Sequence, residues 1–175
     1  MMYEVLPWVF ATGFLTKLVD LSVDEGLKIA RPLIYMAGAA YGILIAYVIS
    51  NYPLLSPLGL AVVFAVMLAG KIDRKPHITG IVFMVIFLGI WGFAETDLVL
   101  LSIFLFAGTM DEIFSDLADK RKIKGKAAKV FENRIILEIT ALSVSLATGY
   151  WIIFLGMLSY DLGYFFTGKT GRYFK

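Results

Sequence analysis

The chain contains no cysteine and a single histidine, His77, among its 175 residues. Without cysteine it can form no disulfide, bind no metal through a thiolate and use no cysteine nucleophile. One histidine argues against a zinc enzyme, because catalytic zinc sites usually combine several histidine or cysteine ligands. The sequence also lacks a glycine-rich phosphate loop, a Ser/His/Asp set and a nucleic-acid-binding motif. We therefore expect no nucleic-acid partner.

Charged residues are scarce within the hydrophobic stretches and concentrate between them. The chain is 59% hydrophobic and its mean hydropathy is +0.81, well above the roughly 45–50% apolar content of soluble domains. Long apolar blocks separated by charged gaps are typical of helical membrane proteins. The sequence predicts an all-α, polytopic transmembrane bundle of five to six spans, forming one integral membrane domain over residues 1–175 in the cell membrane, with the lipid bilayer as its surroundings.

The apolar blocks define the expected helices, which cover residues 5–19, 32–50, 54–70, 78–94, 97–110 and 135–166. The first block is short and contains Lys17, so it predicts either a sixth span or an amphipathic helix on the membrane surface. The last block is longer than the roughly 20 residues that cross a bilayer, and we expect it to be one long, tilted helix.

Basic residues mark alternate gaps between these blocks. They occur in the gaps at 17–31, 71–75 and 120–134, whereas the gaps at 51–53 and 95–97 contain none. Because cytoplasmic loops are enriched in lysine and arginine, we expect the three charged gaps to be cytoplasmic. On this scheme the basic C-terminal tail falls on the outside, against the rule.

An acidic stripe follows the fifth block. If that helix continues, Glu112, Asp116 and Asp119 lie on one face, at successive turns. Mg²⁺ prefers oxygen ligands and often binds carboxylates together with substrate phosphates, and the adjacent Lys120 and Arg121 could bind such phosphates. A solvated helix extension with ordinary ion pairs is the alternative interpretation.

Other charged residues are expected on the same side. Asp73 is a further candidate Mg²⁺ ligand, and Lys28 and Arg31 are further candidate phosphate-binding residues. Asp20 and Asp24 form a second acidic pair, although Asp24 could instead cap a helix beginning near Gly26. We expect His77 to be an exposed loop residue rather than a ligand or a base, and Asp161 to lie at the far membrane interface.

Gly38 and Gly42 form a small-xxx-small pattern, which lets two helices approach closely. It predicts internal packing or, alternatively, a homo-oligomer through this face.

Three stretches resemble the UbiA superfamily of intramembrane prenyltransferases. Residues 27–32 (LKIARP) are similar to the start of that family's first helix, and residues 112–119 (EIFSDLAD) to its second Asp-rich motif. Residues 72–80 (IDRKPHITG) are faintly similar to the end of its first Asp-rich motif and the segment that follows. The resemblance implies a helical bundle that binds an isoprenoid diphosphate through Mg²⁺, with Glu112, Asp116, Asp119 and Asp73 as ligands. The family has about nine spans, and of its first Asp-rich motif only Asp73 remains.

The sequence therefore leads to three functional hypotheses. The first is a Mg²⁺-dependent prenyltransferase-like transferase, or a degenerate relative of one, that binds a lipid (prenyl) diphosphate at the cytoplasmic face. The second is a small cation transporter or channel, and the third is a non-catalytic membrane assembly or scaffold protein.

Overall fold

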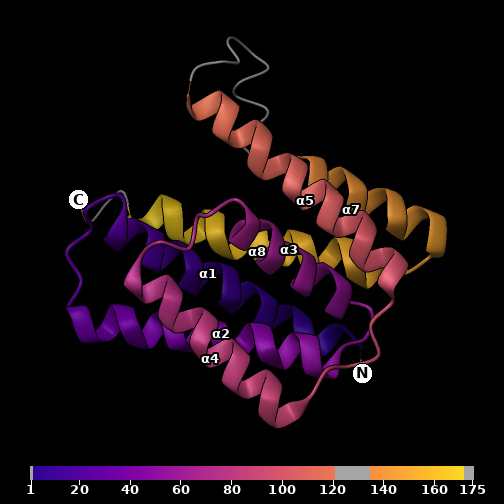
Figure 1. Cartoon of the computed structure of the whole chain (residues 1–175), viewed down its shortest axis with the longest axis horizontal. Coiled ribbons are helices and arrows are strands. Elements are labelled where there is room, and N and C mark those ends of the chain that lie inside the picture. Colours follow the sequence, from indigo (N-terminus) through magenta and orange to yellow (C-terminus); the bar gives the residue numbers. More distant parts are fainter. Residues whose placement is uncertain (1, 121–134, 172–175) are drawn as a thin grey trace.

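The computed structural model describes residues 2–120 and 135–171, apart from the side chain of Asp119. Within these residues the chain is all-helical, as predicted, with a short 3₁₀ helix, η1, before the first α-helix. The helices, labelled as in Figure 1, are η1 (Met2–Val5), α1 (Leu6–Val23), α2 (Arg31–Asn51), α3 (Ser56–Leu68), α4 (Lys75–Trp91), α5 (Leu98–Asp119), α7 (Ile135–Thr148) and α8 (Trp151–Gly171).

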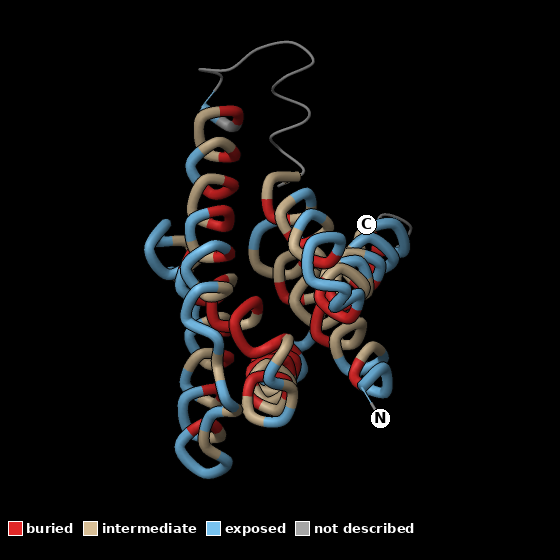
Figure 2. The backbone as a smooth tube through the Cα atoms, turned by 90° about the vertical axis from the view of Figure 1, so that its right-hand side faces the viewer, coloured by how far each residue is buried: buried red, intermediate tan, exposed pale blue. Residues whose placement is uncertain are grey.

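The helices form a bundle in which α1 packs against α8 and α2, α2 against α4, and α3 against α5 (Figure 1). The largest buried cluster lies where α3, α5, α7 and α8 meet, around the fully buried Phe104. Buried positions follow the inward sides of the helices, and exposed ones follow the outward sides (Figure 2). Many exposed residues are large and apolar, including Ile90, Leu98 and Phe165. Such a surface is expected where helices face lipid.

The chain passes back and forth between two ends of the bundle. One end, which we call the charged end, contains the segments 24–30 and 69–74, the start of α7 and the last turns of α5 and α8 (Figure 1, left and top). The opposite end, which we call the aromatic end, contains the N-terminus and the segments 52–55, 92–97 and 149–150. All three tryptophans, Trp8, Trp91 and Trp151, lie in the first or last turn of a helix at the aromatic end.

Gly38 and Gly42 pack against α4 within the same chain. A Cβ atom on Gly38 would lie 2.4 Å from the carbonyl oxygen of Pro76, and one on Gly42 would lie 2.0 Å from that of Gly80. The two backbones therefore approach as closely as the predicted internal packing requires. This face is occupied by α4, so it is not exposed for contact with a second copy.

The prediction of one long helix over residues 135–166 is wrong, because the chain turns back at Gly149. This glycine has a φ of +77°, a conformation that side-chain-bearing residues rarely adopt. The buried Ser145 hydroxyl donates to the Tyr150 carbonyl oxygen at 3.1 Å and accepts from the Phe154 amide at 3.1 Å. As a result, α7 and α8 form a hairpin. The turn also puts Asp161 in the middle of α8, and not near the end of one long helix as expected; its position at a membrane interface stays a prediction.

Three of the described helical stretches are long and apolar enough to cross a membrane: Met2–Val23, Arg31–Asn51 and Leu98–Ala118. This is fewer than the five to six spans predicted. The apolar helices Ser56–Leu68, Lys75–Trp91 and Ile135–Thr148 are shorter, and α8 is not among the three. The N-terminal stretch, which could have been a surface helix, is one of the three.

Candidate functional site

The charged end gathers ionisable side chains into two clusters. The histidine cluster consists of Asp20, Asp24 and His77, and the glutamate cluster of Lys71, Glu112, Asp116 and Lys120. The connection between α3 and α4 runs between them, since Lys71 belongs to one cluster and Arg74 pairs with Asp24 of the other.

In the histidine cluster, residues from α1, its C-terminal cap and α4 converge. One potential ligand atom from each of Asp20, Asp24 and His77 lies within 4.8 Å of the other two. Asp20 Oδ1 and His77 Nε2 lie 3.2 Å apart. Arg74 Nε lies 3.6 Å from Asp24 Oδ1 and equally far from an oxygen of Asp73. Three carboxylates, an imidazole and a guanidinium thus share one corner of the bundle.

Two tyrosines hold this cluster from neighbouring helices. Tyr164 of α8 donates its hydroxyl to Asp20 Oδ2 at 2.7 Å, and the Tyr41 hydroxyl of α2 lies 3.0 Å from His77 Nδ1. A continuous chain of polar contacts, Tyr164–Asp20–His77–Tyr41, therefore links α8, α1, α4 and α2, with hydrogen bonds at its two ends and the Asp20–His77 contact between them. Polar side chains oriented by such networks keep a defined geometry.

The glutamate cluster consists of ion pairs between α5 and the segment before α4. Lys71 Nζ lies 2.7 Å from Glu112 Oε2 and 3.3 Å from Asp116 Oδ1, and Lys120 Nζ lies 2.9 Å from Asp116 Oδ2. Glu112 is only 4% exposed, so it requires a nearby cation in place of water. The hydrogen bond that Lys120 donates to Asp116 raises the pKa of the Lys120 ammonium group. The structure thus places lysine side chains against both carboxylates.

Asp111, next to Glu112, has a separate structural role. Its two carboxylate oxygens accept from the backbone amides of Ile136 and Leu137, at 2.9 and 2.7 Å. Asp111 therefore caps the start of α7 from another helix, since these amides have no carbonyl partner within the described part of α7.

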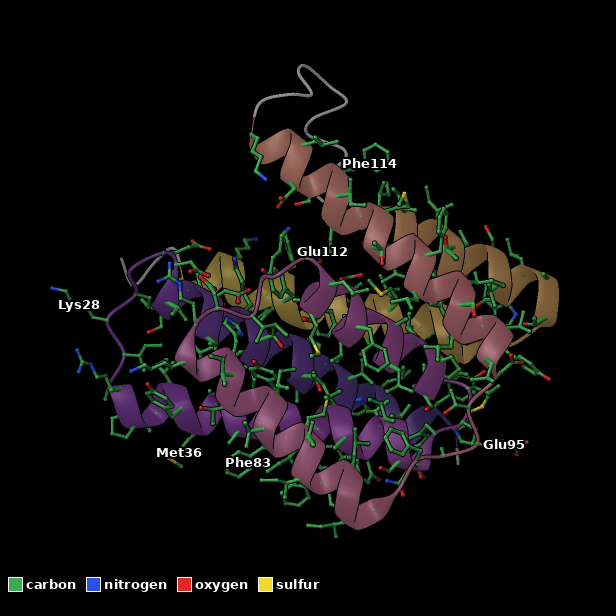
Figure 3. All side chains as sticks on the ribbon, in the orientation of Figure 1. Lys28, Met36, Phe83, Glu95, Glu112 and Phe114 are labelled. Atoms are coloured by element: carbon green, nitrogen blue, oxygen red, sulfur yellow. The ribbon has the colours of Figure 1, made fainter. Side chains whose placement is uncertain are left out.

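The predicted metal ligands are only partly brought together. Glu112 and Asp116 share Lys71, as the expected continuation of α5 implies. Asp73 is exposed and pairs with Arg74 rather than with α5. Asp119 was predicted to be the third member of the stripe, but its side chain lies outside the described part of the structure. Figure 3 places Glu112 on the side of α5 that faces the rest of the bundle.

The predicted phosphate-binding residues are likewise dispersed. Lys28 is exposed and projects away from the bundle (Figure 3), and Arg31 is exposed at the first turn of α2. Lys120 is engaged by Asp116. Arg121 lies outside the described residues.

His77 was predicted to be an exposed loop residue, and this is wrong. It lies in the first turn of α4, its side chain is only 14% exposed, and it contacts both Asp20 and Tyr41. Asp24 does not cap a helix beginning near Gly26, because it is the C-cap of α1 and the next helix begins at Arg31. The four-residue spacing of Asp20 and Asp24 was the sequence signal for the histidine cluster. Nothing in the sequence indicated that Tyr41 and Tyr164 would contact it.

A shallow apolar groove of about 240 Å³ lies between α3 and α4 beside the charged end. Its lining consists of Met67, Gly70, Ile72, Ile78, Ile81 and Val82. Gly70 and Ile72 flank Lys71 in the sequence. The last three lining residues belong to α4, which begins at Lys75. A larger apolar groove lies between α5 and α7, lined by residues that include Phe106 and Thr140.

Comparisons with protein-family models, curated proteins and solved structures found no match to this chain. The resemblance to intramembrane prenyltransferases therefore stays a prediction.

Proposed function

We propose that this chain is an integral membrane protein that binds a phosphorylated lipid, such as a prenyl diphosphate, at its charged end. The observation that carries the proposal is the apolar groove between α3 and α4, which lies beside Lys71, Arg74 and Lys75. An isoprenoid chain would lie in this groove, and its phosphates would meet the cationic side chains. Arg74 and Lys75 are both exposed, so an anionic headgroup can reach them.

The distribution of charges supports a membrane orientation with the charged end in the cytosol. Every described lysine and arginine lies at this end or within about two helical turns of it. Because α7 and α8 form a hairpin, α8 ends at the charged end too, which removes the conflict that the sequence raised. Tryptophans favour membrane interfaces, and here all three lie at the opposite end. We infer that the seven α-helices of the described residues run through the membrane in alternating directions, although only three of the described helical stretches are long and apolar enough to span it fully.

Mg²⁺ at Glu112 and Asp116 stays a prediction, and so does prenyl transfer. Lys71 and Lys120 already neutralise these carboxylates, so a cation would have to displace them. The lipid proposal does not depend on that exchange, because Arg74 pairs with Asp24 and Asp73 and not with Glu112 or Asp116.

The test is binding of a prenyl diphosphate to the purified protein in detergent, measured by native mass spectrometry or calorimetry. We expect a Val82→Trp substitution, which fills the groove, to weaken binding about tenfold or more. Val85→Trp is the matched control, because Val85 is exposed on the same helix but does not line the groove.

A double substitution of Arg74 and Lys75 by alanine should weaken binding of the diphosphate and leave binding of the corresponding prenol unchanged. Equal affinity in the Val82→Trp and Val85→Trp variants would refute the groove as the lipid site.

A further inference from the structure

We propose that Asp20, Asp24 and His77 form a binding site for one divalent transition-metal ion, of the class that includes Mn²⁺, Fe²⁺ and Zn²⁺. The site is separate from the stripe on α5, and it goes beyond the lipid binding proposed above. Its ligands come from two helices that are far apart in the sequence, with Asp24 at the end of one of them.

The spacing of the donor atoms fits a common ion. Metal–oxygen and metal–nitrogen bonds in such sites are about 2.0–2.2 Å long, so two adjacent ligand atoms on one ion lie roughly 3 Å apart. Asp20 Oδ1 and His77 Nε2 are separated by 3.2 Å, and the Asp24 donor completes a triangle with no side above 4.8 Å. Asp24 is exposed at the C-terminal cap of α1, so its carboxylate can close this gap by a side-chain rotation.

The histidine is oriented as a metal ligand requires. A ligating imidazole usually donates its second ring N–H to a neighbouring oxygen, which fixes the tautomer and the ring plane. Here the Tyr41 hydroxyl lies 3.0 Å from His77 Nδ1, which leaves Nε2 directed at Asp20. The Tyr164 hydroxyl holds the other oxygen of Asp20 at 2.7 Å. Neither tyrosine belongs to the donor triangle, and together they place two of its three members.

The donor set favours a transition metal over Mg²⁺. The imidazole nitrogen suits Zn²⁺ and Fe²⁺ and the carboxylates suit Mn²⁺, whereas Mg²⁺ is usually bound through oxygen atoms alone. Two carboxylates neutralise a divalent charge, and three protein ligands leave coordination positions open for another group. Arg74 lies beside Asp24, so an anionic oxygen at the open position would also meet a guanidinium. If that oxygen belongs to a lipid phosphate, its binding to the metal and to Arg74 rests on the function proposed above.

The experiment is titration of the chelator-treated protein in detergent with Mn²⁺ alone, following free Mn²⁺ by electron paramagnetic resonance. We expect one ion per chain, displaced by Zn²⁺ but not by an equal concentration of Mg²⁺. His77→Ala and Asp24→Asn should each lower the affinity tenfold or more. Tyr41→Phe, which keeps the ring and removes only the hydroxyl, should lower it on the order of tenfold.

Asp73→Asn is the matched control. Asp73 and Asp24 both lie 3.6 Å from Arg74 Nε, but only Asp24 belongs to the donor triangle. Affinity within about twofold of the parent chain in Asp73→Asn, together with the loss in Asp24→Asn, supports the site. An equal loss in both variants, or equal displacement by Mg²⁺, overturns it. Asp24 is exposed, so its variant stays informative even if His77→Ala fails to fold. No lipid is present, so the lipid proposal is tested independently.

Discussion

Asp111 shows how one side chain can hold a helix to which it does not belong. It is only 2% exposed and accepts from two amides at the start of α7. Asp111→Ala leaves both amides without this partner, and we expect it to lower the free energy of unfolding by about 2–4 kcal/mol. Asp111→Asn keeps one carbonyl oxygen and should lose roughly half as much. Denaturant unfolding in detergent measures both, and equal stability of the alanine variant and the parent would contradict this role.

Lys71 is the cation against which Glu112 is buried. Lys71→Ala leaves Glu112 without that cation, at a cost of roughly 1–3 kcal/mol in unfolding free energy because Lys71 itself is partly exposed. Adding Glu112→Gln should restore part of the loss, because a neutral amide needs no counter-charge. A double-mutant cycle measures this coupling. If the two losses simply add, the ion pair contributes nothing.

At the residue scale, the sequence predicted where charge gathers but not how it pairs. The run after the fifth apolar block correctly indicated that α5 continues as a helix and that Glu112 and Asp116 share a face. It could not reveal Lys71 as their partner, because that contact depends on how α3 packs against α5. The Tyr41–His77 and Tyr164–Asp20 contacts likewise join residues more than thirty positions apart, beyond the reach of local spacing.

At the scale of elements, glycine sets the distance between α2 and α4. Gly42→Ala would place a methyl group 2.0 Å from the Gly80 carbonyl oxygen, so the helices must separate. We expect a loss of about 1–3 kcal/mol in unfolding free energy from this overpacking.

Gly89→Ala, on the same pair of helices, is the control, since nothing lies within 4 Å of the added atom. It should be neutral or stabilising by up to about 1 kcal/mol through helix propensity. Thermal denaturation of the two variants side by side tests the prediction, which fails if both behave alike.

The apolar blocks predicted most helices well because length and hydrophobicity are local properties. The failure came at residues 148–151, where neither proline nor charge interrupts the block. There the turn depends on Gly149 and on the two hydrogen bonds of the buried Ser145, which is polar but inconspicuous among other serines and threonines. A single glycine in an apolar run is compatible with a continuous helix, so the hairpin could not be recognised from the pattern.

For the whole molecule, the proposed orientation can be tested with single cysteines, since the natural chain has none. Two substitutions, Asn51→Cys and Glu95→Cys, place a cysteine at the aromatic end, and two others, Lys28→Cys and Asp73→Cys, place one at the charged end. All four positions are exposed. In intact cells, an impermeant maleimide should label the first pair and not the second. Labelling of all four only after the membrane is opened, or labelling of one member from each pair, would exclude the proposed arrangement.

The placement of the tryptophans has a spectroscopic consequence. All three lie in the end turns of helices at one pole of the bundle, and each is between 43% and 48% exposed. Tryptophan fluorescence, excited at the red edge of the absorption band, therefore reports on that pole alone. A metal or lipid that docks at the opposite pole and still changes the emission must have moved the helices between them, so the unlabelled protein carries its own readout of long-range coupling.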